Sequence, residues 1–519
     1  MKRDCYFFYF ILDRKGVFLK NGAIMKRLYY NATFFSMRFI DCKYQAVLCE
    51  DGVIVDVFHD VPEHLDCEYV DLRGSFVLPG FVDSHTHSFE GGLYQNGCDL
   101  SQCDTLSDVL DNLRATTPFG DMVFAWKFDE NRVRERRFPT RAELDKVCPA
   151  VPVLLRRVDG HSSVVNTMGL RLSHISPNSV SDILRGSDND VAAHSFHRNL
   201  SADAIVQCYM TAQSIALQNG HTGIHTMIGD ATADTLHFEM LLNRLDDFII
   251  DFTLYPQCFD VEQVVAIYDK VARDIKVRRI GGCMLADGSF GSGTAALSIA
   301  YQKNKNHKGV LYHSQSFWND FVNKSQSQGL QVGVHCIGDM AIEQITKAVL
   351  SCQRHCSAQI IHCEYVRDDM LPEMKQAGVY AVMQPMFDAL WGGENGFYAD
   401  VLGKERLKYL NRFRTLTECG IVVVGSSDWY ITDLSALGGI NSAMRHHISS
   451  ERLSNFEAIK LYTTNHAQLT AEEDTKGLIE KKYAADFVCL DRDIMSLDDV
   501  SGANVLFTIK DGNIVYERC

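Results

Sequence analysis

The middle of the chain alternates short apolar runs with longer stretches of helical composition. Four of these runs are rich in β-branched residues and too short to be helices; they cover residues 331–334, 359–361, 380–383 and 421–424. Strand-like runs that alternate with helical segments predict parallel βα units. In a parallel barrel built from such units, polar residues at the carboxyl ends of the strands normally carry the chemistry.

The two ends of the chain have a different pattern, with short strands and tight turns. Residues 45–57 read as a hairpin that turns at Glu50-Asp51-Gly52, and residues 485–516 read as three further strands. We therefore predict one small β-domain assembled from residues 25–79 and 471–519. Residues 80–470 would form the barrel with insertions, and residues 1–24 an N-terminal extension, with Met25 as an alternative first residue.

Composition limits the class of protein. Apolar residues make up 46% and charged residues 23% of the 519, and the formal net charge of −15 argues against binding nucleic acid or anionic lipid. No run of 18 apolar residues occurs, and the short apolar stretch after Lys2 and Arg3 lacks a small-residue cleavage site. The 17 cysteines are dispersed and odd in number, which is typical of reduced thiols. We expect a cytoplasmic protein without a membrane partner.

A further strand-like run leads directly into two histidines. Residues 76–82 are apolar, and Asp83-Ser84-His85-Thr86-His87 follows them. Residues two apart on a strand share a face, so His85 and His87 can offer two imidazoles to one ion. Zinc accepts neutral imidazole nitrogens at about 2.0–2.1 Å. A His-x-His pair alone is weak evidence for a metal site, and its place after a strand strengthens it.

Three more candidate ligands stand at or just beyond the ends of later strand-like runs: His335, His362 and Asp428. Each one alone is more simply explained as a hydrogen-bonded residue at a strand end. Together they keep the spacing of whole βα repeats, so we predict that they meet His85 and His87 at one site for a divalent metal, zinc being favoured.

These residues lie in motifs that resemble amidohydrolase family 3, and in particular its branch of N-substituted formamide deformylases. The matching segments are residues 79–87, 159–161, 287–292, 335–339, 427–429, 462–465, 477–479 and 485–488. The resemblance covers nearly the whole chain from about residue 28. It implies a (β/α)₈ TIM barrel with a small β-sandwich formed by both termini. It also implies one or two metal ions held by the His-x-His pair, two later histidines and the last aspartate.

One position departs from the family pattern. The family usually has a lysine, often carbamylated and bridging two metals, four residues before the Asp-Gly that here is Asp287-Gly288; this chain has Cys283 there. A thiolate is a soft ligand that suits zinc, so Cys283 could bind or bridge metal. It could equally be a core thiol, which would leave a single ion, and both interpretations stay open.

The resemblance implies hydrolysis of a C–N bond in a small-molecule amide, such as an N-formyl or N-acyl compound, by metal-activated water. Asp428 is the candidate general base and then general acid. His161, Trp126, Gln384 and Trp429 are candidate substrate contacts, and ordinary packing explains the last three equally well. Two alternatives stay open, a deaminase on the same scaffold and a non-catalytic metal-binding regulatory protein. The expected partner is a small-molecule substrate, and a homodimer stays open.

Overall fold

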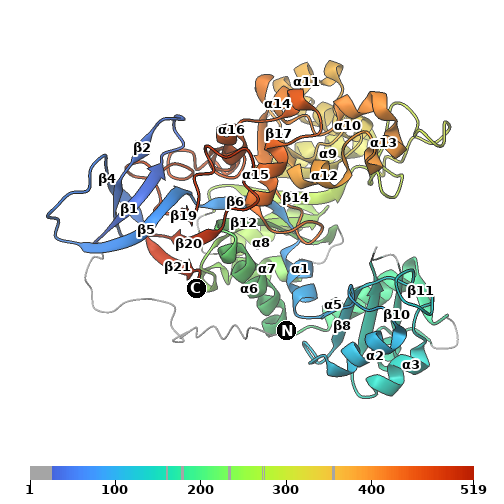
Figure 1. Ribbon diagram of the computed structural model, residues 1–519. Helices are drawn as coiled ribbons and strands as arrows, with labels where there is room; N and C mark the ends of the chain where they lie inside the picture. The colour runs from blue at the N-terminus through green and yellow to red at the C-terminus, as the bar shows by residue number, and fades with distance from the viewer. Residues whose placement is uncertain are drawn as a thin grey trace.

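The computed structural model describes residues 26–158, 160, 162–176, 181–231, 235–271, 273, 275–352 and 357–519. The expected N-terminal extension, residues 1–24, lies outside these. Three parts can be distinguished in Figure 1: a sheet that uses both ends of the chain, a central set of parallel strands with helices around it, and an inserted unit. None of the described helices is both long enough and apolar enough to cross a bilayer. The fifteen cysteines that the structure describes are free thiols.

Strands from both ends of the chain pair in one eight-stranded sheet, ordered β21-β20-β19-β5-β1-β3-β4 with β2 beside β1. The strands are β1 (Lys26–Phe35), β2 (Lys43–Tyr44), β3 (Ala46–Glu50), β4 (Val53–Phe58), β5 (Glu68–Pro79), β19 (Phe487–Leu490), β20 (Val505–Lys510) and β21 (Asn513–Glu517). The predicted hairpin is present as β3 and β4, with Asp51 and Gly52 at positive φ in its turn. The two ends join where Phe487 of β19 pairs antiparallel with Pro79 of β5.

Eight parallel strands form the centre of the molecule. Three of the four predicted runs lie within one of them, and the fourth, 421–424, begins one residue before its strand. They are β6 (Phe81–Thr86), β12 (His221–Ala231), β13 (Asp251–Cys258), β14 (Arg278–Leu285), β15 (Leu330–Cys336), β16 (Ala358–His362), β17 (Tyr380–Met383) and β18 (Val422–Gly425). Hydrogen bonds join β13-β12-β6 and β14-β15-β16-β17-β18. Between the two groups β13 contacts β14, and a parallel bridge joins Thr86 to Trp429. The fold is of the α/β, TIM-barrel-like type.

Helices follow most of these strands and bury their apolar faces against them. They are α1 (Ser88–Gln95), α6 (Ala202–Gln218), α7 (Leu236–Leu242), α8 (Val261–Lys270), α9 (Gln315–Ser327), α10 (Asp339–Leu350), α11 (Leu371–Ala377), α12 (Pro385–Trp391), α13 (Phe397–Leu402), α14 (Phe413–Glu418), α15 (Ala436–Met444), α16 (Asn455–Lys460) and α17 (Thr464–Leu469). Local sequence sets where several begin, because Ser201, Asp260 and Ser314 accept hydrogen bonds from backbone N–H groups of the first turn. All residues of β15 and β16 are buried, as expected for parallel strands covered on both faces.

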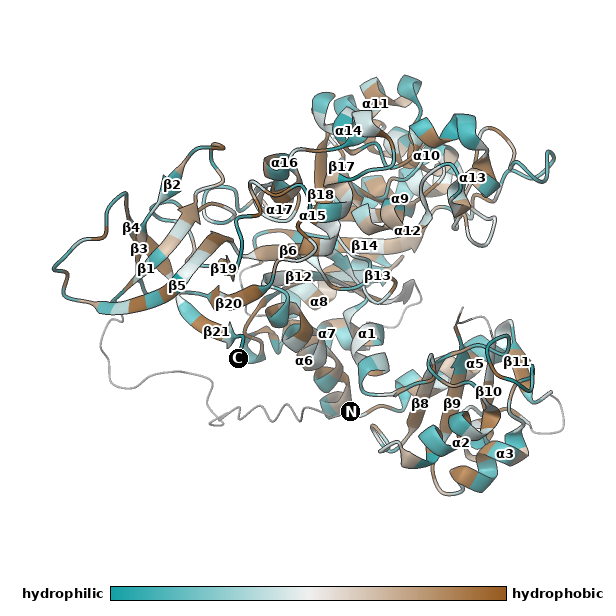
Figure 2. Ribbon diagram, in the orientation of Figure 1, coloured by the Kyte–Doolittle hydropathy of each residue, from teal (hydrophilic) through white to brown (hydrophobic). Residues whose placement is uncertain are grey.

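An inserted unit lies between α1 and α6 in the chain and has a sheet of its own. Its strands, in the order β11-β10-β9-β8-β7, are β7 (Cys98–Asp99), β8 (Val123–Phe128), β9 (Val153–Arg157), β10 (Ser162–Val165) and β11 (Ile183–Arg185). Its helices are α2 (Leu106–Ala115), α3 (Arg141–Val147), α4 (Thr167–Leu172) and α5 (Ser187–Arg198). A separate apolar cluster fills this unit, and Figure 2 shows β8 and β9 as mostly hydrophobic. One face of its sheet therefore packs on this cluster, while the other face, with Phe124 and Leu154, joins the main core.

Candidate metal centre

The predicted ligands come together at the carboxyl ends of the central strands. They are His85 in β6, His87 just after it, Cys283 in β14, His335 in β15, His362 at the end of β16, and Asp428 just beyond β18. Two of them sit on backbone that non-glycine residues rarely adopt, with φ of +70° at His362 and +56° at Asp428. Such conformations persist only where the surroundings hold them, and they are common at functional sites.

Two histidines face the carboxylate of Asp428. Nε2 of His85 lies 3.2 Å, and Nε2 of His87 lies 3.3 Å, from the same oxygen, Oδ1 of Asp428. Burial by itself would raise the pKa of Asp428, but the hydrogen bonds and charges of the two histidines outweigh it and lower the pKa. Asp428 is therefore ionised at neutral pH.

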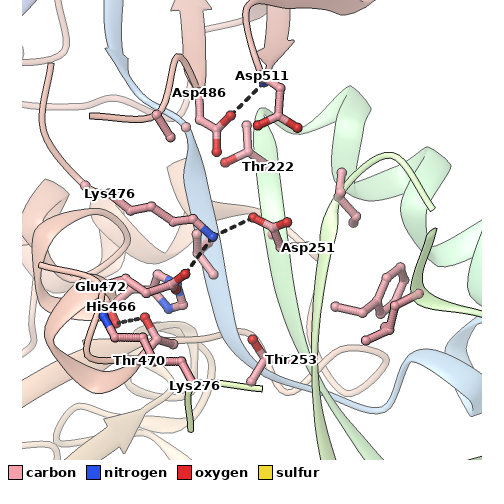
Figure 3. Close-up of a pocket in the computed structure, with 18 of the residues that line it drawn as sticks. Thr222, Asp251, Thr253, Lys276, His466, Thr470, Glu472, Lys476, Asp486 and Asp511 are labelled. Atoms are coloured by element: carbon pink, nitrogen blue, oxygen red, sulfur yellow. Dashed lines mark hydrogen bonds and ion pairs between the residues drawn. The ribbon is translucent and has the colours of Figure 1, made fainter. Parts of the chain in front are cut away.

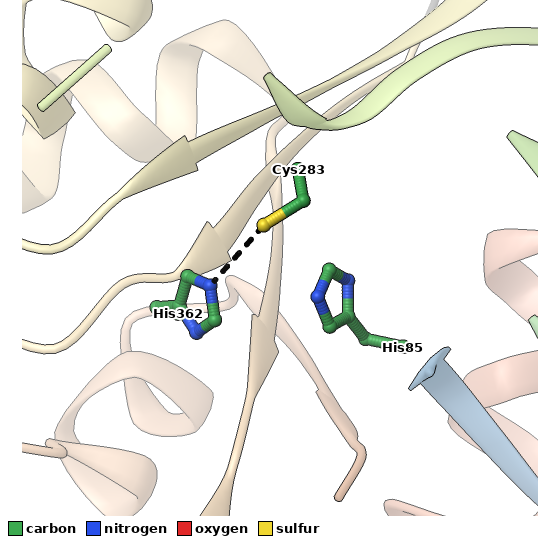
Figure 4. A group of neighbouring side chains, drawn as sticks. All are labelled: His85, Cys283 and His362. Carbon is green, nitrogen blue, oxygen red and sulfur yellow. Dashed lines mark hydrogen bonds between the residues drawn. The ribbon is translucent and has the colours of Figure 1, made fainter. Parts of the chain in front are cut away.

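Cys283 lies on the other side of this group. Its Sγ is 3.6 Å from Nδ1 of His335 and 3.9 Å from Nε2 of His362, and Figure 4 shows it facing His362 with His85 nearby. Burial opposes ionisation of the thiol, but the four surrounding histidines together hold the pKa of Cys283 well below its ordinary value. The sulfur thus lies among the imidazoles, in surroundings that favour its thiolate form.

These separations fit donors arranged around metal ions. Two nitrogen or oxygen ligands of a tetrahedral zinc lie about 3.4 Å apart, and a sulfur and a nitrogen ligand about 3.6 Å apart, given the usual zinc–ligand distances. The contacts of Asp428 with His85 and His87, and of Cys283 with His335, fall close to these values. The donor atoms of His85, Cys283 and His362, and those of His85, His87 and Asp428, form two groups compact enough to hold an ion.

Neighbouring groups orient the imidazoles. Oε1 of Gln384 accepts a hydrogen bond from Nδ1 of His362 at 2.8 Å, and the carbonyl of Gly288 lies 3.2 Å from Nε2 of His335. Each contact places the ring proton on one nitrogen and leaves the other nitrogen for the centre. Gln384 is only 1% exposed and is committed to His362. Gln384 therefore lies where it can orient the ring of His362, and it is not among the described residues that line the cavity.

A cavity of about 480 Å³ opens beside the centre. Its described lining consists of His87, Glu90, Gly229, Gln257, Phe259, Cys283, Leu285, Tyr312, His313 and Tyr430. Neither Trp126 nor Trp429 is among these residues, in contrast to the prediction. Trp429 is 5% exposed, and its ring packs so closely on Gly91 that no side chain would fit there. Trp126 stacks on Tyr94 instead, and His161 lies outside the described residues.

Comparison with known proteins agrees with this geometry. A sequence profile described as the amidohydrolase family matches residues 68–516. The chain belongs to the amidohydrolase family. It is 26% identical to the protein named amidohydrolase YtcJ of Bacillus subtilis, over 95% of this chain and all of that one. It is 25% identical to an N-substituted formamide deformylase of Arthrobacter pascens, over 87% of this chain and 90% of that one.

The fold is also found among solved structures. An uncharacterized metal-dependent hydrolase from Pyrococcus furiosus superposes with a TM-score of 0.79, at 24% identity, over 91% of this chain and the whole of that one. The family resemblance drawn from the motifs is thus confirmed, and the chain is a hydrolase of the amidohydrolase family. That the six converging side chains bind metal remains a prediction, which their geometry supports.

Two carboxylates of the family motifs, Asp287 and Asp83, bind backbone N–H groups of the loops that carry the candidate ligands. The sequence analysis did not name them as site residues. Asp287 accepts hydrogen bonds from the backbone N–H groups of Ala296, Ile337 and Gly338, so it ties the loop after β14 to the end of β15. Asp83 accepts from the N–H groups of His85 and Ser427, at 3.1 Å each. Burial raises the pKa of each carboxyl to about 6.

A third group of possible ligands, Asp388, His446 and His447, shares no residue with the six donors described above. Nδ1 of His447 approaches Oδ1 of Asp388 to 2.5 Å, and the backbone N–H of His447 donates to Oδ2 at 3.0 Å. That separation is too short for two ligands of one zinc, which lie about 3.4 Å apart. The group is therefore a hydrogen-bonded anchor between α12 and the segment after α15.

A second cavity, of about 460 Å³, lies at the opposite, amino ends of β6, β12 and β13 (Figure 3). Several of its charged side chains are paired with one another, among them Lys476 with Asp251 and Arg273 with Asp246. Lys476 contacts Asp251 and Glu472, both at 2.9 Å. In a barrel of this type the amino-terminal face normally contributes stability, whereas chemistry takes place at the carboxyl ends. We therefore assign the reaction to the cavity beside the six donors.

Proposed function

We propose that this protein is a metal-dependent amidohydrolase that cleaves a non-peptide C–N bond, in an N-formyl or N-acyl amide of small size. One observation carries the proposal: four histidines, a carboxylate and a thiolate converge at ligand-like spacing beside an open cavity. Membership of the amidohydrolase family and the similarity to an N-substituted formamide deformylase support the reaction class.

Two ions account for the donor set better than one. His85, His87 and Asp428 would hold the first ion, and His335 and His362 the second. Cys283 would bridge them, since its sulfur lies close to histidines of both sets. Zinc suits this set of imidazole, carboxylate and thiolate donors.

The catalytic roles of the side chains follow from their positions. When bound, a divalent metal supplies a water of lowered pKa and polarises a carbonyl oxygen. The carboxylate of Asp428 lies beside His85 and His87, and its lowered pKa keeps it ionised. It can therefore take the proton of the attacking water and deliver it to the leaving nitrogen. The carbonyl of Gly288 and the amide of Gln384 keep the rings of His335 and His362 from turning.

The lining of the cavity favours uncharged amides over peptides. A dipeptide carries a carboxylate, which would need a cationic partner inside the cavity. The described lining contains neither lysine nor arginine, and it presents the apolar faces of Phe259, Leu285 and Tyr312. An N-substituted amide without a carboxylate meets no such penalty.

The strands are proposed to close into a (β/α)₈ barrel with β18 beside β6 and β13 beside β14. The contacts between β13 and β14 and the Thr86–Trp429 bridge support closure. The terminal sheet would serve as the β-sandwich domain that completes the barrel's amino-terminal side. A parallel barrel places all eight loops that follow its strands around one opening, which is the arrangement the site needs.

The test combines metal analysis with a panel of probes. Zinc-loaded protein is expected to release amine from N-benzylformamide and N-benzylacetamide, and little or none from glycylproline. Ammonia release from aminopyrimidines would favour a deaminase instead. A protein that binds zinc and turns over none of these compounds would contradict the hydrolase assignment and favour a metal-binding regulatory role.

A further inference from the structure

Tyr94 of α1 links the inserted unit to the active-site cavity. Figure 1 shows α1 between the unit and the central strands. The ring of Trp126, from β8, stacks on the ring of Tyr94 with centroids 4.9 Å apart and planes 13° apart. Nη1 of Arg156, from β9, donates a hydrogen bond to Oη of Tyr94 at 2.9 Å. Two neighbouring strands of the inserted sheet thus hold one side chain of the barrel.

Arg156 makes this contact from a half-buried position. Its other described hydrogen bond runs from Nη2 to the carbonyl of Gly160. A guanidinium taken out of water is costly unless its N–H groups are hydrogen-bonded, and these two contacts hold the group in one orientation. Here its position fixes the hydroxyl of Tyr94.

Tyr94 also contacts a residue of the cavity wall, Tyr430. Its ring meets that of Tyr430 edge-to-face, with centroids 4.8 Å apart at 80°. Tyr430 lines the cavity, and its ring lies 6.4 Å from that of His87, a member of the candidate metal centre. The series Trp126, Tyr94, Tyr430 therefore runs from the core of the inserted unit to the substrate space.

We propose that the inserted unit sets the substrate selectivity of the enzyme by holding Tyr430 as one wall of the cavity. Trp126, Arg156 and Tyr94 are positioning residues, and Tyr430 is the specificity-determining residue that contacts the substituent on the amide nitrogen. The proposal rests on the proposed function for the identity of the substrate. It gives Trp126 a role in substrate binding although Trp126 is not among the residues that line the cavity.

Kinetics on a large and a small amide test selectivity. Trp126→Leu is expected to raise KM for N-benzylformamide about two- to tenfold, the value of one aromatic contact, with kcat little changed. KM for N-methylformamide should change less, because its methyl group is too small to reach the wall. Trp126→Phe keeps an aromatic ring, so its KM for N-benzylformamide should stay close to that of the wild-type protein.

A matched control separates positioning from loss of stability. Phe128 lies on the same strand, is 1% exposed and packs against Phe138 within the inserted unit. Phe128→Leu is expected to lower stability and leave KM for both amides unchanged. An equal KM increase in Phe128→Leu, or no increase in Trp126→Leu, would overturn the proposal.

A spectroscopic measurement decides the positioning without turnover. 3-Fluorotyrosine incorporated in place of Tyr430 alone gives one ¹⁹F resonance in the zinc-loaded protein. Trp126→Leu and Tyr94→Leu are expected to shift or broaden this resonance, and Phe128→Leu to leave it in place. If the wild-type protein hydrolyses neither amide, the proposed function fails while this result still decides the positioning. An unchanged resonance in Trp126→Leu would refute the claim that Trp126 positions Tyr430.

Discussion

Gln384 offers a direct test of the candidate metal centre, because it touches a ligand and nothing in the cavity. Its Oε1 accepts from Nδ1 of His362 at 2.8 Å, while its Nε2 donates to Oγ of Ser426 at 3.0 Å. Ser426 in turn donates to the carbonyl of Met383, so the amide is held in one orientation. The ring proton of His362 is therefore kept on Nδ1, and Nε2 stays available beside Cys283.

Gln384→Leu removes the hydrogen-bond acceptor and replaces the amide side chain with an apolar one of similar size. His362 must then bury an unpaired N–H group or move its proton to the nitrogen that faces the metal. Loss of a partner that orients a ligand typically weakens metal binding 10- to 100-fold, which corresponds to about 1.4 to 2.7 kcal/mol. Gln384→Glu keeps an acceptor and should restore most of the affinity.

The assay is a chelator-competition titration of metal-free protein with zinc, with thermal unfolding recorded in parallel. Gln359 provides the matched control, since it is a fully buried amide on β16 that bonds Tyr255 and Gln331 rather than a ligand. Gln359→Leu should reduce stability and leave zinc affinity unchanged. Wild-type affinity in Gln384→Leu, or an equal loss in Gln359→Leu, would refute the role given to Gln384.

Four further outcomes are expected. Asp428→Asn should reduce kcat by about 10²-fold or more with little change in thermal unfolding, since the amide cannot accept the proton; kinetics on N-benzylformamide check this. His85→Ala combined with His87→Ala should lower the zinc content, measured by elemental analysis, because too few donors remain for the first ion. Cys283→Ser should remove the sulfur scatterer at about 2.3 Å from the zinc-edge X-ray absorption spectrum, and a wild-type spectrum with no sulfur would rule the thiolate out. Burial lowers the pKa of His466 to about 3, below its unfolded value, so the unfolded state binds the additional proton as pH falls. Unfolding free energy should then drop by about 2 kcal/mol from this residue between pH 7 and pH 5, and urea titrations of His466→Gln should show a shallower pH dependence.

The pattern of apolar residues along the sequence predicts the central strands well, because a parallel strand covered on both faces is apolar along most of its length. The run 331–334 and the run 380–383 each lie within a strand of the structure. The candidate ligands could be named for the same reason: His335 and His362 interrupt apolar runs at strand ends, where a buried polar side chain needs a partner.

What the pattern could not predict depends on long-range pairing. The strands of the inserted unit read locally like those of the central sheet, yet β8 and β9 pair with each other, and one face of this pair packs on a separate apolar cluster. The orientation of Gln384 toward His362 and the stacking of Trp126 on Tyr94 depend on side chains far apart in the sequence. These contacts of Gln384 and Trp126 could therefore not be derived from the order of residues along the chain.

The number of donor side chains bears on whether Cys283 binds metal or is a core thiol beside a single ion. A catalytic zinc uses three protein ligands and keeps an open position for water. Six donor side chains converge here, enough for two such ions, and His85 belongs to both compact groups, so the two groups form one continuous centre. A neutral core thiol beside a single ion would leave the sulfur without a ligand role. A thiolate held between two ions would share its charge with both, and β14 brings the sulfur to 3.6 Å from Nδ1 of His335 and 3.9 Å from Nε2 of His362, close enough for that role.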